Sequence, residues 1–162
     1  MRKWSERSKE VAYLLNPAFC GRIIYNTIKK YGDVTHRTFP FPLIYLILPL
    51  ILHKHTRELI NSKTKMLIWL QRYPETIINF AKRTKDLIPI TNEAIELLMQ
   101  AKKIRLTNNG ELEVVMTSKS LSKTKFTNIE IKECINKSEH IAKWFAEVGK
   151  TETIYISLGV RP

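Results

Sequence analysis

Two of the four histidines, His53 and His55, lie two residues apart beside Lys54 and Arg57. Imidazole nitrogens bind metals, but residues two apart on a helix point to different sides, so these rings do not form a metal pair. No HExxH motif and no cysteine cluster accompanies them. We interpret the segment as a solvated or phosphate-facing basic helix end. In the sharper hypothesis, Lys54, His55 and Arg57 contact an acidic partner or a nucleic-acid backbone.

A third histidine, His140, is near Glu133, Lys137 and Trp144 on an expected helix. Such a group could transfer a proton, but nothing in the spacing demands it, and a helix-surface histidine is the simpler interpretation. The chain has only two aspartates, whereas a metal-dependent nuclease needs clustered carboxylates. The sequence therefore predicts no catalytic residues, no metal, no cofactor and no enzymatic activity, although a cryptic nuclease stays a weaker alternative.

The segment Gly149-Lys150-Thr151 resembles the end of a phosphate-binding loop. That motif needs a further glycine five residues before the Gly-Lys pair, where this chain has Trp144. It also needs a strand before and a helix after the loop, so that backbone N–H groups face the phosphates. Here we expect a helix before and a strand after it, so we do not predict nucleotide binding.

The charge of the chain is strongly positive, with a formal net charge of +12 over 162 residues. Such a charge attracts nucleic acid, anionic lipid or an acidic protein, and it does not choose among them. The cations follow two belts along the sequence. The first belt comprises Lys54, Arg57, Lys63, Lys65, Arg72, Lys82, Arg83 and Lys85. The second belt, which we expect to contact a partner or nucleic acid, comprises Lys102, Lys103, Arg105, Lys119, Lys123 and Lys125.

An uncharged, mostly apolar run from Phe39 to Leu52 precedes the first belt. A membrane span needs about 20 apolar residues, so this run is too short to cross a bilayer. Pro49 lies deep enough in it to kink or end a helix. We therefore predict a buried core helix over Leu43–Leu52, with Lys54 and Arg57 emerging from it at a functional surface. With two distant cysteines and a polar N-terminus, the sequence favours the cytoplasm.

The remaining pattern predicts a mainly α (α+β) fold in one compact unit. We expect a helical part over 1–73 and a second part over 74–162, with a break at Ile88-Pro89-Ile90 and a hairpin around Asn108-Asn109-Gly110. Helix, break, helix and hairpin is the order in a winged helix. This order supports an alternative function, an autonomous DNA-binding protein, although Glu93 and Glu96 would repel phosphate in a major groove.

Helix ends are expected from local signals. Asn16-Pro17 begins one helix and Gly32 ends it, Thr64 and Pro74 begin two others, and Trp4–Leu15 forms a first one. The pair Thr127 and Glu130 predicts a capping box for a long amphipathic helix that Gly149 closes. Residues 151–162 alternate in polarity and predict a terminal strand, so we expect Trp144 and Arg161 near a partner surface.

Three segments together resemble the middle component of bacterial three-component ABC systems. They are LLNPAFCGRIIYNTIKKY, FPFPLIYLILPLILHKHTRE and SEHIAKWFAEVGKTETIYISLGVRP, and the resemblance extends from about Trp4 to Pro162. It implies two partners, an ABC-type ATPase (SMC or Rad50-like) and a third, effector protein. It further implies a non-catalytic adaptor role in anti-phage defence, in a hetero-oligomeric complex. We expect this complex to have no membrane contact and to touch DNA without sequence specificity.

Overall fold

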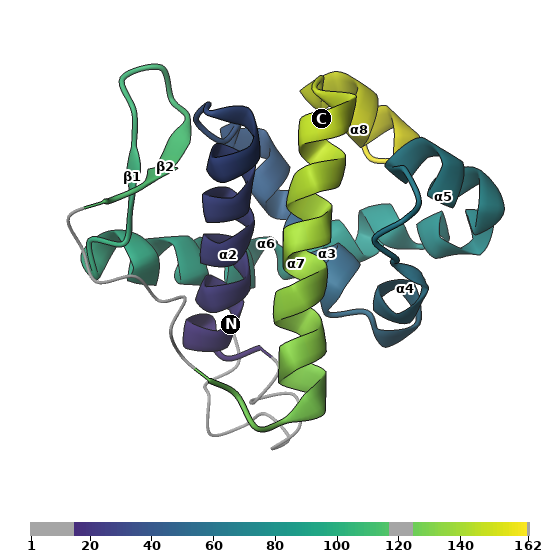
Figure 1. Ribbon diagram of the computed structural model, residues 1–162, viewed down its shortest axis with the longest axis horizontal. Helices are drawn as coiled ribbons and strands as arrows, with labels where there is room; N and C mark the ends of the chain where they lie inside the picture. Colours follow the sequence, from purple (N-terminus) through teal and green to yellow (C-terminus); the bar gives the residue numbers. More distant parts are fainter. Residues whose placement is uncertain (1–14, 117–124, 162) are drawn as a thin grey trace.

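The computed structural model describes residues 15–116 and 125–161, and this part of the chain is mainly helical with one small hairpin (Figure 1). The predicted fold class is therefore confirmed. The elements are α2 (Pro17–Thr35), η2 (Phe41–Leu43), α3 (Ile44–Ile51), α4 (Lys54–Leu59), α5 (Met66–Arg72), η3 (Pro74–Ile77), α6 (Phe80–Gln100), β1 (Ile104–Leu106), β2 (Leu112–Val114), α7 (Ile129–Val148) and α8 (Thr151–Ser157). The helix expected over Trp4–Leu15 and the residues Lys119 and Lys123 fall outside the described residues, except for Leu15.

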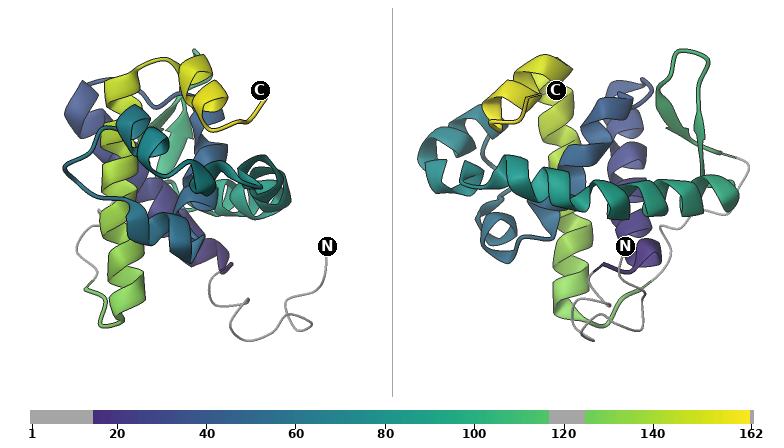
Figure 2. Two further views of the ribbon diagram at one scale, coloured as in Figure 1. Left: turned by 90° about the vertical axis from the view of Figure 1, so that its right-hand side faces the viewer. Right: turned by 180° about the vertical axis from the view of Figure 1, so that it is seen from behind.

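Helices α2 and α7 form the centre of the molecule. They lie side by side and run in the same direction, while α6 crosses behind them at a steep angle (Figures 1 and 2). Between α2 and α7, the Thr27 hydroxyl lies 3.0 Å from the Ile23 carbonyl and 3.4 Å from the Ser138 carbonyl. Cys20 and Cys134 are also buried in these two helices. Small side chains at this contact let the two backbones approach closely.

The apolar run forms the middle of the core, as the sequence predicts. Leu43 to Ile51 are buried apart from Tyr45, and Leu52 is half-buried. Pro49 lies inside α3, which ends two residues later at Ile51. None of the helices in the described ranges is both long and apolar enough to cross a membrane.

Several helix ends differ from the expected positions. Asn16 caps α2 as predicted, with its side-chain oxygen 2.8 Å from the Ala18 N–H. However, α2 continues through Gly32, and His36 provides the left-handed residue at φ 55°. Asn128, rather than Thr127, caps α7, because its side chain accepts from the Ile131 N–H at 3.1 Å.

Other expected boundaries also move. Lys65, and not Thr64, is the N-cap residue of α5. Pro74 begins only the short helix η3, and the long helix α6 begins at Phe80. The Gly149 position is confirmed, since its φ of 75° ends α7. Sequence signals thus place these ends to within a few residues.

The break predicted at Pro89 is wrong. Helix α6 is continuous from Phe80 to Gln100 with Pro89 inside it, and the Pro89 ring is exposed. Ile90, Ala94 and Leu98 continue the buried stripe beyond the proline, so packing against the core outweighs the local preference to stop. The helix–break–helix order that suggested a winged helix is therefore absent from residues 74–103.

The hairpin is confirmed. β1 and β2 pair antiparallel with Ile104 opposite Val114 and Leu106 opposite Leu112, and Gly110 in the turn has a φ of 74°. The Phe39 backbone extends this ladder by exchanging hydrogen bonds of 2.7 and 2.8 Å with Leu112. The hairpin is thereby attached to the start of the apolar run.

The predicted terminal strand is wrong, because residues Thr151–Ser157 form helix α8. Ile154, Tyr155 and Leu158 are buried at helical spacing, whereas Ile156 is 73% exposed. The Tyr155 hydroxyl donates to the Pro42 carbonyl at 2.6 Å. The C-terminal segment therefore packs on the apolar run of its own chain instead of presenting a strand edge.

Candidate functional site

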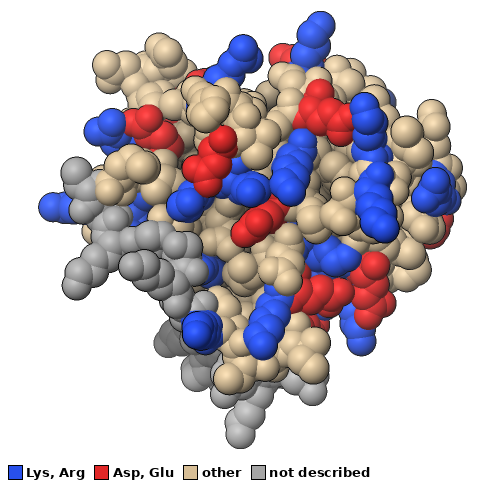
Figure 3. Space-filling model, viewed as in Figure 1, with Lys and Arg blue, Asp and Glu red and all other residues tan. Residues whose placement is uncertain are grey.

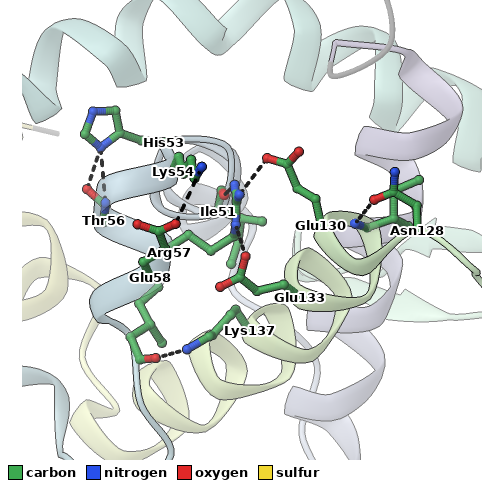
Figure 4. Close-up of polar contacts among 12 residues, drawn as sticks. Ile51, His53, Lys54, Thr56, Arg57, Glu58, Asn128, Glu130, Glu133 and Lys137 are labelled. Carbon is green, nitrogen blue, oxygen red and sulfur yellow. Dashed lines mark hydrogen bonds and ion pairs between the residues drawn. The ribbon is translucent and has the colours of Figure 1, made fainter. Parts of the chain in front are cut away.

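Arg57 lies in the contact between α4 and α7 (Figure 4). Its Nε is 3.1 Å from the Glu133 carboxylate, its Nη2 is 2.7 Å from Glu130, and its Nη1 donates to the Ile51 carbonyl at 2.8 Å. Its side chain is only 1% exposed. The expectation that Arg57 emerges at a functional surface is therefore wrong, because the guanidinium is buried and bonded within the chain.

The surroundings of Arg57 keep it charged. Burial lowers the pKa of its guanidinium, but Cys134 and the hydrogen bonds to Glu133 and Glu130 outweigh burial and raise this pKa overall. Lys137, one turn further along α7, donates to the Ile60 carbonyl at the end of α4. Together, these contacts fix the short helix α4 and its flanking turns on α7.

Lys54 and His55 of this basic segment are exposed, whereas His53 is half-buried. The Lys54 side chain is 73% exposed, and its Nζ lies 3.8 Å from the Glu58 carboxylate. His53 caps α4, with its Nδ1 accepting from the Thr56 backbone at 3.4 Å and contacting the Thr56 hydroxyl at 2.8 Å. Burial first, and then the positive charges of Arg83, His55 and Arg57, lower the pKa of His53.

Trp144 is also buried, which contradicts its expected place near a partner surface. Its ring is 4.9 Å from that of Trp69, and its indole N–H donates to the Thr64 carbonyl at 2.7 Å. The Trp69 indole in turn donates to the Leu59 carbonyl at 2.8 Å. The two tryptophans thus attach the segment between α4 and α5 to α7.

The predicted contact residues of the second belt are dispersed. Lys102 is exposed at a left-handed φ of 52°, and Arg105 pairs with Glu113 at 2.5 Å across the hairpin. Lys103 is half-buried, and Lys125 and Arg161 are exposed. The hairpin and α4 lie on opposite sides of the molecule (Figure 1), so the structure does not bring Lys54 together with the second belt.

Exposed apolar side chains on α5 and η3 were missed by the sequence analysis. Leu67, Ile68, Ile77 and Ile78 are 43%, 48%, 38% and 62% exposed, and α5 contacts η3. We call these four residues the α5–η3 surface. Only Met66 and Trp69 of α5 are buried, since a short helix reading MLIWL cannot turn every apolar residue inward. Such a concentration of apolar residues at the surface is typical of a contact with another protein.

Metal-binding side chains do not cluster anywhere in the described part of the chain. The two cysteines are buried, and burial is the main cause that raises the pKa of Cys20 to about 12 and of Cys134 to about 11. Both thiols are therefore protonated at neutral pH, which makes them poor nucleophiles.

A comparison with protein families identifies the family of the chain. The family model described as "ABC-three component (ABC-3C) system Middle Component 3" matches residues 4–162. The chain therefore belongs to this family over nearly its whole length, and the resemblance found in the sequence is confirmed. No curated protein and no solved structure matches the chain. Membership in a three-component system implies that the protein works with further components.

Proposed function

We propose that the protein is a non-catalytic adaptor subunit in a bacterial anti-phage defence complex. In this role it couples an ABC or SMC-like ATPase to an effector protein. The observation that carries the proposal is the family match over residues 4–162, because a middle component of a three-component system has two further components to contact. The α5–η3 surface adds physical support, since its apolar side chains stay exposed among residues 15–116 and 125–161.

The α5–η3 surface serves as the docking site for one of the two other components. Ile68 of α5 and Ile78, the residue directly after η3, are its most exposed members, and in this proposal the partner buries both. Arg57 and the two tryptophans hold α4 and the start of α5 on α7, which gives this surface a rigid support. A preorganised surface binds more tightly because less conformational freedom is lost.

Co-expression with the products of the two neighbouring genes tests this proposal. We expect the wild-type chain to co-purify with at least one of them, and Ile68→Lys/Ile78→Lys to lose at least about tenfold in affinity, the size of a modest interface contribution. The matched control is Val34→Lys/Leu106→Lys, which places the same charges at apolar positions 47% and 52% exposed. A chain that binds neither product contradicts the adaptor role, whereas equal binding by both variants refutes only the docking site.

A further inference from the structure

Cationic side chains surround the middle of α7 on three segments of the chain. Lys143 and His140 lie on α7, Lys30 comes from α2, and Lys63 and Lys65 come from the segment between α4 and α5. Figure 3, which looks onto α2 and α7, shows several Lys and Arg side chains on this face, with Asp and Glu side chains among them. We call these five residues the α7 basic band.

A hollow lies on one side of this band, between α7 and the 61–65 segment. Its volume is about 120 Å³, and its charged or titratable lining residues are Lys63, Lys65, His140, Lys143 and one carboxylate, Glu147. The segment is held in place, because Thr64 accepts the Trp144 indole N–H at 2.7 Å and the Asn61 side chain accepts the Lys63 N–H at 3.1 Å. The hollow therefore has lysines on two sides, on α7 and on the 61–65 segment that the Trp144 hydrogen bond holds in place.

The positive charge of this band is only partly neutralised. Lys65 pairs with Glu147 at 2.9 Å, and Glu139 is the other carboxylate near His140. Within the described part of the chain, Lys30, Lys63 and Lys143 form no ion pair. These three ammonium groups are therefore available to an external anion.

We propose that the α7 basic band binds the phosphodiester backbone of nucleic acid without reading its sequence, with one phosphate in the hollow between Lys63 and Lys143. The hollow is of the size of a small anion, and exposed lysines act as point charges that suit phosphate oxygens. The site combines Lys63 and Lys65 of the first belt with Lys30, His140 and Lys143, which belong to neither belt.

The composition of the band favours nucleic acid over an acidic protein. Protein interfaces have an apolar centre, whereas nucleic-acid interfaces are more polar and more positively charged. The strongly exposed apolar residues of the described chain lie elsewhere, and the nearest along α7 is Ile129 in its first turn. None of these exposed apolar residues lines the hollow, where the mostly buried Trp144 is the one large apolar side chain.

His140 can report the binding of a phosphate. Burial first, and then Lys143, Lys137 and Lys30, lower the pKa of His140, while Glu139 raises it. Lys63 and Lys65 line the same hollow from the other side. A bound phosphate adds negative charge next to the imidazole and therefore raises this pKa.

Binding of the full-length chain to a random-sequence DNA duplex at several salt concentrations tests the proposal. Because Lys63→Gln/Lys143→Gln removes both charges that hold the phosphate in the hollow, it should reduce the slope of log affinity against log salt by about one. The matched control Lys82→Gln/Lys85→Gln removes the same charge from exposed positions of α6. Equal loss in both variants would show a net-charge effect only and would overturn the proposal.

Proton NMR of His140 provides an independent measurement. We expect the His140 pKa to rise on addition of the duplex in the wild type, and to rise less in Lys63→Gln/Lys143→Gln. Undetectable DNA binding at low salt, or tighter binding of poly-glutamate than of the duplex, would overturn the proposal in favour of an acidic protein ligand. These outcomes are independent of co-purification with the ATPase and effector, so the adaptor role and this site can fail separately.

Discussion

At position 57, the side chain joins two elements that are far apart in the sequence. The Arg57 guanidinium binds Glu130 and Glu133 of α7 and the Ile51 carbonyl that ends α3. Arginine suits this place because its planar group donates in several directions at once. The two carboxylates keep 49% and 30% of their side chains exposed, so the ion pairs are not fully desolvated.

Replacing Arg57 with alanine should destabilise the fold. We expect Arg57→Ala to lower the free energy of unfolding by about 2–4 kcal/mol, because it leaves a cavity and a carbonyl and two carboxylates that have lost their donor. Chemical denaturation followed by circular dichroism measures this change. Lys54→Ala on the exposed face of α4 should change stability by less than about 0.5 kcal/mol. A loss below about 1 kcal/mol for Arg57→Ala would show that the pair contributes little.

The element α4 should be sensitive to pH. Its N-cap His53 accepts a hydrogen bond through Nδ1, which only the neutral imidazole can do. Because the pKa of His53 is lowered in the fold, its contribution to stability is complete above the unfolded pKa of about 6.5 and declines as pH falls through that value.

The variant His53→Asn isolates this effect. Asparagine caps helices without titrating, so the variant should lose less stability than the wild type between pH 7 and pH 5. The measurement is the denaturant midpoint at each pH. Carboxylate protonation affects both proteins equally, and His140 should make the same residual contribution in both. Identical pH profiles would contradict the role of His53 as a neutral cap.

The helix α6 contains a proline, Pro89, that interrupts its backbone hydrogen bonds. Pro89 is exposed in its interior and has no N–H with which to bond the Lys85 carbonyl. We expect Pro89→Ala to raise the free energy of unfolding by about 1–2 kcal/mol, with denaturation as the measurement. If this variant is less stable than the wild type, the backbone geometry that Pro89 imposes is required for α6 to pack on α2 and α3.

Local signals predicted some elements well and others poorly. The run Leu43–Leu52 was placed in the core correctly, because an uncharged apolar segment of that length has no other soluble position. The terminal segment was predicted as a strand, because the apolar residues Ile154, Ile156 and Leu158 occur at every second position. Only tertiary packing, in which Tyr155 reaches Pro42, selects the helical stripe.

The candidate surfaces could not be found from sequence for a similar reason. Arg57 is separated from Glu130 by 73 positions, so nothing in the local sequence indicates that the two residues form an ion pair. Lys30 and Lys143 came together only through the pairing of α2 with α7. In contrast, Lys102 was predicted as a contact residue of the second belt, and it is exposed.

At the scale of the whole molecule, the three segments that resemble the family meet in one core. Phe39 packs edge-on against Tyr31 with ring centres 5.2 Å apart and lies 6.5 Å from the Phe145 ring. Tyr31 belongs to the first segment, Phe39 to the second and Phe145 to the third. The motifs therefore describe the way the chain folds, while the surfaces that we propose as contact sites lie outside the core.

The buried thiols on α2 and α7 should report opening of this core. Cys20 and Cys134 are 0% exposed, and burial raises the pKa of each thiol. Labelling by iodoacetamide therefore requires the two helices to separate, and we expect it to be about a thousand times slower in the native chain than in denaturant. The variant Asn136→Cys adds an exposed thiol on the same helix, and mass spectrometry of the peptides should show this site labelled rapidly. If Cys20 and Cys134 are labelled as fast as position 136, the α2–α7 contact opens locally and is not the stable centre of the molecule.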